Sequence, residues 1–303
     1  MMKCIFIYNP ASGRGQIVNQ TNYIAKRLRE VYDVVDVYPS KSSRDITEVT
    51  IKACEKYDAI IFSGGDGTFN EVAMGVASCD RRPPLGYIPQ GTTNDIARNL
   101  RIPRNVKGAL KVILAGKTIK HDVGKINDHY FVYVAAIGAC TGTSYTTKHE
   151  EKRLLGRLAY ARNGINEFFT TPLSKVKVIS EDKSIETTAP LVLVLNSISV
   201  GGMPFNRYGH LNDGLFDVIL VNNDRSKGRL NIIKLFLSRI LGLRKAKEAI
   251  ALHASKFRIE IDGEQTWCID GEEGPKGSVD IENLHSHLTI FAPKRKAKSQ
   301  EKR

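Results

Sequence analysis

The sequence predicts two domains of different class, an N-terminal doubly wound α/β domain and a C-terminal antiparallel β-sandwich-like domain. Short apolar strands alternate with helical patterns as far as about residue 122, which is typical of a parallel sheet covered by helices. After Asp122-Val123-Gly124 short β-like runs become frequent, and several alternate between apolar and polar residues. A chain of 303 residues is long enough to form two such domains.

The N-terminal domain, residues 1–122, is predicted to contain four strands separated by helices. The strands are expected near 3–8, 34–38, 59–62 and 85–88, and the helices near 15–30, 44–56, 69–78 and 93–100. Loops rich in glycine and polar residues follow the first, third and fourth strands. Doubly wound sheets bind ligands at the carboxyl ends of their strands, so we expect a binding site at these loops.

The C-terminal domain, residues 123–286, is predicted to be rich in strands. The β-like runs lie at 129–135, 175–180, 190–196, 216–221, 256–262, 265–269 and 287–292. Two patterns with apolar residues at helical spacing interrupt them, at 151–170 and 229–250. Packing against the core explains such apolar stripes. The basic residues Lys234, Arg239 and Arg244 make a membrane-facing role an alternative for the segment 229–250.

The charge of the chain limits its partners. Its 45 Lys and Arg against 32 Asp and Glu give a net charge of +13, which favours nucleotide, nucleic acid or an acidic lipid surface. No aromatic-studded basic sheet or DNA-binding motif accompanies this charge, so no nucleic-acid partner is expected. The basic tail, residues 294–303, is interpreted either as a solubilising end or as a contact for anionic lipid headgroups.

The cysteines and apolar runs indicate the compartment. Five scattered cysteines without CxxC spacing predict neither a disulfide framework nor a zinc site. Cys4 and Cys268 lie in apolar strand patterns and are predicted to be small core residues. The N-terminal apolar run is short and leads directly into a loop, so no signal peptide is expected. No uncharged run approaches the length of a membrane span. We therefore expect a cytoplasmic protein.

The most informative stretch is Ser63-Gly64-Gly65-Asp66-Gly67-Thr68, between an apolar strand pattern and the start of a helix. Its glycines let the backbone approach a ligand and expose N–H groups, while the helix N-terminus adds partial positive charge, so the turn suits phosphate. A carboxylate at this place would repel bare phosphate, which indicates that a cation lies between them. A tight connection is the alternative for such a turn taken alone.

Two further loops have the same character. Asn9-Pro10-Ala11-Ser12-Gly13-Arg14-Gly15 follows the first strand, and Gln90-Gly91-Thr92-Thr93-Asn94-Asp95 follows the fourth, beside another helix N-terminus. An ordinary helix cap is the alternative for the second loop taken alone. In this order the NPxSGxG, GGDGT and GTxND segments resemble those of the bacterial diacylglycerol kinases, lipid kinases related to sphingoid-base kinases and NAD kinases.

This resemblance implies an ATP-binding first domain of the NAD kinase and diacylglycerol kinase type, completed by the last strand at about 287–293. Phosphoryl transfer needs a phosphate cradle, a divalent cation and a base. The implied ATP-binding residues are Asn9, Pro10, Ser12, Gly13, Ser40, Gly64, Gly65, Asp66, Gly67, Thr68, Asn70, Thr92 and Thr93. Asp66 is also a catalytic candidate, expected to position Mg²⁺.

The predicted general base lies in the segment Cys268-Ile269-Asp270-Gly271-Glu272-Glu273-Gly274. Acidic residues between glycines are typical of a hairpin turn, whereas the resemblance implies a DGE segment whose glutamate, here Glu272, acts as base. Spacing alone does not separate Glu272 from Glu273. Asp262-Gly263-Glu264 is similar, and we interpret it as a plain turn.

The resemblance also implies a structural Mg²⁺ with ligands from Asp213, His210 and Leu215. His210 would use its backbone carbonyl, because an imidazole is a poor Mg²⁺ ligand. A simple Asp-Gly turn is the alternative. Four residues match charged positions of the family's ion network, and ordinary helix-surface ion pairing is the alternative for them. They are Arg14, Asp95, Arg98 and Asp122, of which Arg14 stands where the family often has lysine.

The sequence therefore predicts an ATP- and Mg²⁺-dependent lipid kinase, with diacylglycerol as the favoured acceptor and phosphatidic acid as product. Expected partners are ATP, a membrane lipid and an anionic membrane surface, visited transiently at the inner face of the membrane. A homodimer is compatible with the sequence. No residue separates diacylglycerol from a sphingoid base, undecaprenol or phosphatidylglycerol as acceptor.

Two other functions are weighed against this one. An NAD kinase is disfavoured by the GTTND and DGE segments and by Glu71, which follows GGDGTFN directly. A non-catalytic lipid- or nucleotide-binding regulator of the same fold is disfavoured because it would need neither Asp66 nor Glu272.

Overall fold

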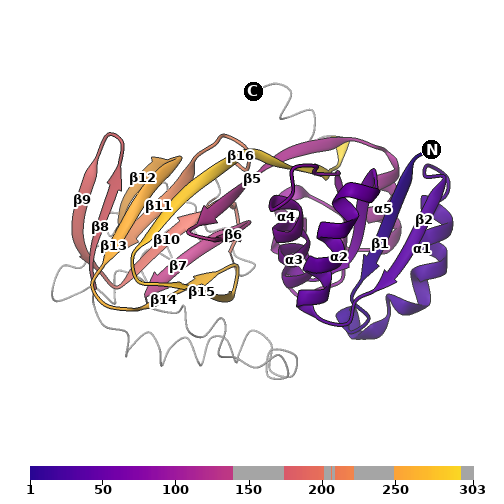
Figure 1. Cartoon of the computed structure of the whole chain (residues 1–303), viewed down its shortest axis with the longest axis horizontal. Coiled ribbons are helices and arrows are strands. Elements are labelled where there is room, and N and C mark those ends of the chain that lie inside the picture. The colour runs from indigo at the N-terminus through magenta and orange to yellow at the C-terminus, as the bar shows by residue number, and fades with distance from the viewer. Residues whose placement is uncertain (139–173, 201–205, 207–208, 222–248, 295–303) are drawn as a thin grey trace. The chain divides into compact units, whose positions relative to one another are not determined.

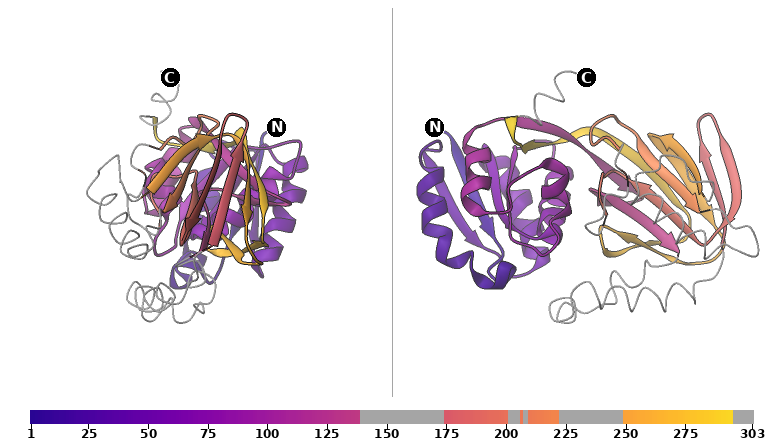
Figure 2. Two further views of the ribbon diagram at one scale, coloured as in Figure 1. Left: turned by 90° about the vertical axis from the view of Figure 1, so that its left-hand side faces the viewer. Right: turned by 180° about the vertical axis from the view of Figure 1, so that it is seen from behind.

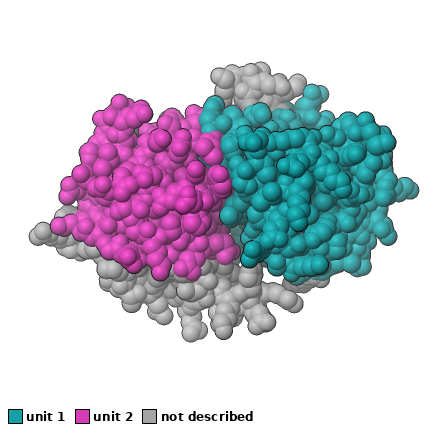
Figure 3. All heavy atoms as spheres, in the orientation of Figure 1, with its two compact units in different colours: residues 1–123, 199–202, 285–303 teal, residues 124–198, 203–284 magenta. Residues whose placement is uncertain are grey.

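The chain forms two compact units (Figure 3). The structure is a computed structural model that describes residues 1–138, 174–200, 206, 209–221 and 249–294. Unit 1 comprises Met1–Val123, Ser199–Gly202 and His285–Arg303, and unit 2 comprises Gly124–Ile198 and Met203–Leu284. Two strands contribute residues to both units, β5 (Thr118–Ile126) and β16 (Val279–Phe291).

Unit 1 is built on a parallel sheet. Strands β1 (Lys3–Tyr8), β2 (Val34–Pro39), β3 (Ala59–Gly64) and β4 (Leu85–Pro89) pair in the order β2-β1-β3-β4. Strand β16 extends this order beside β4, in parallel, with Ile290 opposite Leu85. Every residue of β3 and β4 is buried, which explains why these strands read as continuous apolar runs.

Helices cover both faces of this sheet (Figures 1 and 2). The α-helices are α1 (Thr21–Leu28), α2 (Ser43–Lys56), α3 (Asp66–Ala77), α4 (Asp95–Leu100) and α5 (Val106–Leu114), and two 3₁₀ turns, η1 (Ser12–Gly15) and η2 (Val18–Gln20), precede α1. Helix α3 packs beside α2 and α4, whereas α1 packs beside α5. This arrangement follows from the strand order, because right-handed crossovers in opposite directions place their helices on opposite faces.

Several helix boundaries differ from the predicted ones. The helix expected near 15–30 starts only at Thr21, because Gly15 has a left-handed φ of 77° and 3₁₀ turns occupy the preceding residues. The helix expected near 69–78 starts earlier, at Asp66, since Gly65 is the extended N-cap residue. Helix α5 and strand β5 were not predicted from the sequence.

Unit 2 contains antiparallel strands in two sheets. One has the order β16-β13-β8-β9 and the other β12-β11-β10-β7-β14-β15, while β6 pairs with β5. The bounds are β6 (His129–Phe131), β7 (Val134–Gly138), β8 (Ser174–Ser180), β9 (Ser184–Ala189), β10 (Leu191–Leu195), β11 (Phe216–Val221), β12 (Ala249–Ala254), β13 (Lys256–Ile261), β14 (Thr266–Ile269) and β15 (Glu272–Lys276).

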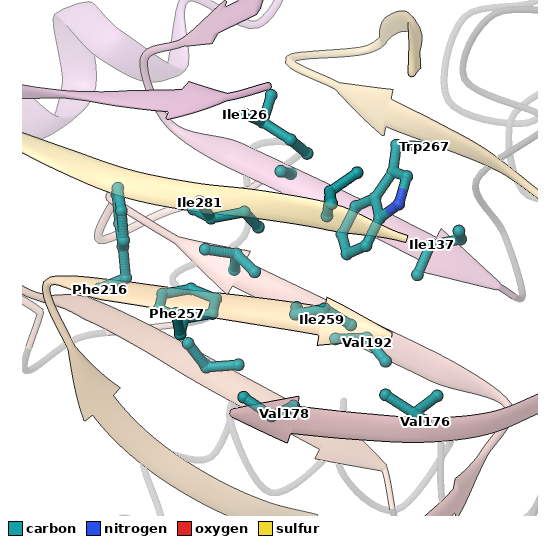
Figure 4. Packing of buried hydrophobic residues seen from close by; sticks show 14 of the residues in the cluster. Ile126, Ile137, Val176, Val178, Val192, Phe216, Phe257, Ile259, Trp267 and Ile281 are labelled. Atoms are coloured by element: carbon teal, nitrogen blue, oxygen red, sulfur yellow. The ribbon is translucent and has the colours of Figure 1, made fainter. Parts of the chain in front are cut away.

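Both sheets of unit 2 contribute to one apolar core (Figure 4). Val178 and Phe257 come from one sheet, and Val192, Phe216 and Trp267 come from the other. The Trp267 indole is fully buried, and its N–H donates to the carbonyl of Gly277 at 2.9 Å. Inward-facing residues of two packed sheets define a sandwich, so the predicted fold class, α/β followed by an antiparallel β-sandwich-like domain, is confirmed.

The sequence missed strands β9, β12 and β15. In β12, Ala249 and Ile250 pair with Val221 and Leu220 of β11. The helix predicted for 229–250 is therefore wrong at residues 249–250, where pairing with a buried neighbour strand outweighs the helical periodicity. The rest of that prediction, the helix at 151–170 and tail residues 295–303 lie outside the described residues. Among the described helices, none has the length and hydropathy needed to cross a membrane.

Candidate functional site at the carboxyl edge of the parallel sheet

The predicted phosphate loops begin at one edge of the unit 1 sheet. Asn9 N donates to the Ser63 carbonyl at 3.1 Å, just beyond the ends of β1 and β3. Gln90 N donates to the Gly64 carbonyl at 2.7 Å, and Ser40 N donates to the Tyr8 carbonyl at 2.9 Å. These bonds extend the parallel ladder past the last strand residues, so the loops after β1, β2, β3 and β4 start side by side.

Glycines allow the loops after β3 and β4 to touch. A Cβ on Gly65 would lie 3.2 Å from the Gly91 Cα, and a Cβ on Gly91 would lie 2.6 Å from the Gly65 Cα. A Cβ on Gly64 would lie 2.2 Å from the Thr68 hydroxyl oxygen. Gly67 differs, because a Cβ there would meet no heavy atom within 4 Å. A side chain at position 64, 65 or 91 would therefore crowd neighbouring atoms, whereas a side chain at Gly67 would point into open space.

Asp66 lies between two helix starts. It is the first residue of α3, and its Oδ1 accepts a hydrogen bond from Ile96 N, near the start of α4, at 3.4 Å. The N-cap residue of α4, Asn94, makes no side-chain capping bond, so Asp66 supplies a capping acceptor from the neighbouring loop. No local sequence pattern predicts this contact, because the two residues are 30 positions apart.

The pKa of the Asp66 carboxyl is raised to about 6, mainly by burial and also by the nearby Asp95 carboxylate, while backbone N–H groups at the start of α4 oppose both effects. Asp95 is itself buried, at 3% exposure. The Asp95 carboxylate disfavours ionisation of Asp66, and a cation beside them would offset this repulsion. The chemistry of the cluster therefore suits a divalent metal ion held by oxygen atoms.

Asp95 and Arg98 are brought together, as the predicted ion network requires of this pair. Arg98 Nη1 lies 3.8 Å from Asp95 Oδ1, one turn along α4. The buried Ser199 hydroxyl lies 2.9 Å from Asp95 Oδ1 and 2.8 Å from Asn99 Oδ1. Sequence reasoning missed Ser199, since it lies outside every motif and about a hundred residues downstream.

Asn94 organises the loop after β4. It adopts a left-handed backbone, φ 51°, which asparagine tolerates better than most residues. Its Oδ1 accepts from Gly91 N at 2.9 Å and from the Tyr87 hydroxyl at 3.1 Å, and its Nδ2 donates to the Gly91 carbonyl at 2.7 Å. The Thr92 carbonyl accepts from Arg104 Nη2 at 2.8 Å. Thr92 and Thr93 thus sit on a backbone fixed by their neighbours.

The first loop is also ordered by its own polar groups. Asn9 Oδ1 accepts from Ala11 N at 2.9 Å, and Ser12 N donates to the Asn9 carbonyl at 3.1 Å. Pro10 lies within this turn, and Gly13 and Arg14 belong to η1, where the position of the Arg14 side chain lies outside the described part of the structure.

Two buried polar atoms near the site have no partner among the described residues, Ser63 Oγ and Asn70 Oδ1. Asn70 is on α3 and is 4% exposed, so its amide oxygen is an acceptor that a ligand could use. The carboxylate of Glu71, the next residue, accepts a hydrogen bond from the Thr47 hydroxyl of α2 and is therefore less suited to contact a ligand.

The candidate base lies on a tight hairpin of unit 2. Strands β14 and β15 are joined by Asp270 and Gly271, with φ of 52° and 92°, and Ile269 pairs with Glu272. Two left-handed residues in a two-residue loop form a type I′ turn, for which Asp-Gly is a preferred sequence. The hairpin reading and the DGE motif are therefore compatible. Glu272 and Glu273 are both exposed.

Asp270 anchors this hairpin. Its carboxylate accepts from the backbone N–H groups of Val132, Tyr133 and Val134 at 2.6, 3.0 and 2.9 Å, and its carbonyl accepts from the Tyr133 hydroxyl at 2.9 Å. The Asp270 side chain is 7% exposed. From the sequence, Asp270 is interpreted only as part of the DGE motif. Only the Asp-Gly pair, which is typical of a hairpin turn, indicates a structural role for it.

The predicted structural Mg²⁺ ligands lie on the turn before β11. Asp213 is exposed, and its Oδ1 accepts from Leu215 N at 3.1 Å, while Gly214 has a left-handed φ of 76°. His210 is exposed on the same turn. Among the residues that the structure describes, no group of three or more His, Cys, Asp or Glu side chains could hold a metal. The predicted Mg²⁺ site would use one carboxylate and two backbone carbonyls, which are not a group of this kind, so the site stays a prediction.

Asp122, the remaining ion-network residue, is fully buried. Its Oδ1 accepts from Ser286 N at 2.6 Å, which ties β5 to β16 within unit 1. Cys4 and Cys268 are buried free thiols, as predicted, and burial raises the pKa of Cys4 to about 12.

Known proteins resemble this chain along its length. A model of the diacylglycerol kinase catalytic domain matches residues 3–126. A diacylglycerol kinase of Bacillus subtilis (strain 168) is 30% identical over 306 residues, covering 98% of this chain and 98% of the relative. A diacylglycerol kinase of Staphylococcus epidermidis is 33% identical over 296 residues, covering 95% and 91%.

A solved structure agrees with these relatives. The crystal structure of a provisionally assigned diacylglycerol kinase of Bacillus anthracis (strain Sterne) matches with a TM-score of 0.84 at 29% identity, covering 97% of this chain and 96% of that one. The matches extend far beyond the GGDGT loop and include both units. The chain therefore belongs to the bacterial diacylglycerol kinase family and is a lipid kinase.

Proposed function

We propose that this lipid kinase transfers the γ-phosphate of ATP, with Mg²⁺, to the free hydroxyl of diacylglycerol and releases phosphatidic acid. The observation that carries the proposal is the Asp66 cluster, a partly buried carboxylate among the glycines of the loops after β3 and β4, at the carboxyl edge of a parallel sheet. Such edges bind nucleotides in doubly wound folds.

The residues present fit both the nucleotide and the metal ion. Open space at Gly67 leaves its backbone accessible to a phosphate, and the α3 N-terminus adds partial positive charge there. Asn70 Oδ1 and Ser63 Oγ, which lack partners among the described residues, offer polar contacts for a ligand. Asp66 would hold Mg²⁺ through carboxylate oxygens, the ligands that this ion prefers.

The chemistry assigns a separate role to each carboxylate. Bound Mg²⁺ would offset the negative charge of the phosphate oxygens. Glu272 accepts the proton of the attacking lipid hydroxyl, whose oxygen bonds to the γ-phosphorus as the bond between that phosphorus and the β–γ bridging oxygen breaks. The other predicted residues, Asn9, Ser12, Ser40, Thr68, Thr92 and Thr93 among them, would position the nucleotide.

The acceptor is tested by transfer from radiolabelled ATP to a total lipid extract, followed by identification of the labelled lipid. We expect labelled phosphatidic acid from the parent protein and none from the Asp66→Asn variant. Label in another lipid would change the acceptor, and label transferred to NAD⁺ in a parallel reaction would favour an NAD kinase. A folded protein that binds lipid and transfers no label to either acceptor would indicate the non-catalytic regulator.

We further propose that a second, structural Mg²⁺ binds Asp213 together with the backbone carbonyls of His210 and Leu215. A chelator should lower the Tm of the parent protein, because a cation that binds only the folded form stabilises it. The Asp213→Ala variant should be insensitive to the chelator. Equal sensitivity of both proteins would remove this metal from the proposal.

A further inference from the structure

A basic hollow lies at the opposite edge of the unit 1 sheet from the nucleotide loops. It has a volume of about 320 Å³ and is lined by Arg82, Lys120, His285, Ser286, His287 and Thr289. Arg82 precedes β4, whereas the Gln90 loop follows it, and the five residues of β4 separate the two edges by roughly 17 Å. The hollow is therefore separate from the candidate ATP site.

His287 holds the Arg82 side chain in place. Its Nε2 lies 3.0 Å from the Ala77 carbonyl, which can only accept, so Nε2 carries the proton and Nδ1 is left as an acceptor. Arg82 Nη1 lies 2.5 Å from that Nδ1 and 2.7 Å from Nε2, so it lies against the edge of the ring that carries both nitrogens. Burial lowers the pKa of His287, which keeps the ring neutral and able to accept. The neutral His287 ring thus contacts the Arg82 guanidinium and leaves its positive charge unneutralised.

The remaining lining groups can donate hydrogen bonds. Lys120 Nζ donates to the Thr289 hydroxyl oxygen at 3.0 Å, which leaves the hydroxyl proton of Thr289 to donate elsewhere. Ser286 contributes a second hydroxyl. Among the described residues, no carboxylate lines the hollow. The Asp122 carboxylate, which accepts from Ser286 N, is fully buried.

We propose that this hollow binds a phosphate group, using Arg82 and Lys120 for charge and the Ser286 and Thr289 hydroxyls as further donors. A fixed guanidinium beside an ammonium and hydroxyl donors suits a tetrahedral oxyanion. Inorganic phosphate and a phospholipid headgroup share this chemistry, and both fit the open, polar lining. The site goes beyond the proposed kinase reaction, since none of its residues belongs to the nucleotide loops or the DGE hairpin.

The test uses the full chain with a non-hydrolysable ATP analogue and Mg²⁺ present, so that the nucleotide loops are occupied. The variant Arg82→Gln/Lys120→Gln is compared with Lys111→Gln/Lys117→Gln, which removes two exposed positive charges elsewhere in unit 1. Imidazole NMR signals of His285 and His287 are followed as inorganic phosphate is added. Co-sedimentation is measured with vesicles of phosphatidylcholine, with and without phosphatidic acid.

If phosphate binds, the histidine signals of the parent and the control should shift saturably. The Arg82/Lys120 variant should bind at least ~10-fold more weakly, since a hydrogen bond to a charged group contributes more than the free energy of a tenfold change in affinity. If the natural source is a lipid headgroup, this variant should instead lose co-sedimentation with phosphatidic acid vesicles relative to the control.

Equal behaviour of the two variants in both assays would overturn the proposal. Thermal unfolding of each variant checks that it is folded. The single substitution Lys120→Gln, at an exposed position, provides the same comparison should the double variant not fold.

Discussion

Asp66 has an observed structural contact and a proposed metal-binding role in the same side chain. Its carboxylate is the candidate metal ligand, and it also accepts the Ile96 N–H at the start of α4. The protein therefore keeps this carboxyl group in a partly buried place that raises its pKa, and a hydrogen bond from the backbone of a second helix offsets part of that cost. A substitution at Asp66 is expected to affect stability as well as phosphoryl transfer.

The stability effect has a defined pH dependence. The folded pKa of Asp66 is raised from 3.8 to about 6, so its contribution to stability is fully present below pH 3.8 and is lost as the pH rises through 6. Asp66→Asn keeps a capping acceptor and removes the titration. Between about pH 4 and pH 7, in metal-free buffer, the parent should therefore lose roughly 1–3 kcal/mol of unfolding free energy relative to this variant. Urea unfolding of both proteins measures this difference, and a difference independent of pH would show that Asp66 titrates normally.

Glu272 and Glu273 can be distinguished by substitution. Side chains alternate across a strand, so the two carboxylates leave opposite faces of β15, and Ile269 and Cys268 are their respective cross-strand partners. We expect Glu272→Gln to lower kcat by roughly 10²-fold with little change in the KM for ATP, in line with loss of a general base. Glu273→Gln and Glu264→Gln are the matched controls and should have mild effects. A large loss of kcat in Glu273→Gln alone would move the base by one residue.

At the scale of elements, the β14–β15 hairpin is held by one buried carboxylate. Asp270 accepts three backbone N–H groups from the segment that connects β6 and β7, so the turn that presents Glu272 is tied to a central strand of its sheet. Its left-handed backbone alone would not hold the hairpin there. The position of Glu272 thus depends on Asp270, to which we assign no part in the proposed reaction.

Asp270→Ala should destabilise the protein by roughly 3 kcal/mol or more, because three buried N–H groups lose their acceptor. Amide hydrogen exchange should speed up at Val132, Tyr133 and Val134 in particular. Asp262→Ala, at the exposed aspartate of the similar Asp-Gly-Glu segment, is the control and should change neither property measurably. Unchanged exchange at 132–134 in Asp270→Ala would contradict the anchoring role.

The elements differ in how far the sequence could predict them. Strands β3 and β4 are buried on both faces, so their apolar runs were recognisable, and the loops after them carry motifs. Strand β12, Ala-Ile-Ala-Leu-His-Ala, has few residues that favour strands and forms because β11 lies beside it. The capping of α4 by Asp66 and the Ser199 contact with Asp95 depend on which loops meet in space, and no local pattern records that.

For the whole molecule, the net charge of +13 is the property that bears on where it works. A lipid kinase has to reach an acceptor embedded in a bilayer, and exposed basic residues near an anionic surface contribute up to ~1 kcal/mol each. We therefore expect the protein to act from the cytoplasm at the inner face of the membrane.

Vesicle binding should rise with the content of anionic lipid and weaken between low and physiological salt, as exposed charges are screened. Truncation after Pro293 should weaken binding and leave activity on detergent-dispersed lipid unchanged, because no predicted phosphate-binding or base residue lies in 294–303. Co-sedimentation at several salt concentrations measures this. Vesicle binding that changes with neither salt concentration nor lipid charge would indicate that the positive charge serves solubility instead of membrane binding.

Strand β16 has a consequence for synthesis of the protein. Residues 285–291 complete a sheet whose other parallel strands end by residue 89, so about 200 further residues must be synthesised before β4 gains its outer neighbour. Until then the nascent chain exposes the edge of a strand whose residues are all buried in the folded protein, and unpaired strand edges of this kind associate with other chains. A fragment cut at the end of the matched catalytic domain, residues 3–126, would carry this edge permanently. Residues 285–291 are thus needed before the sheet of unit 1 is complete.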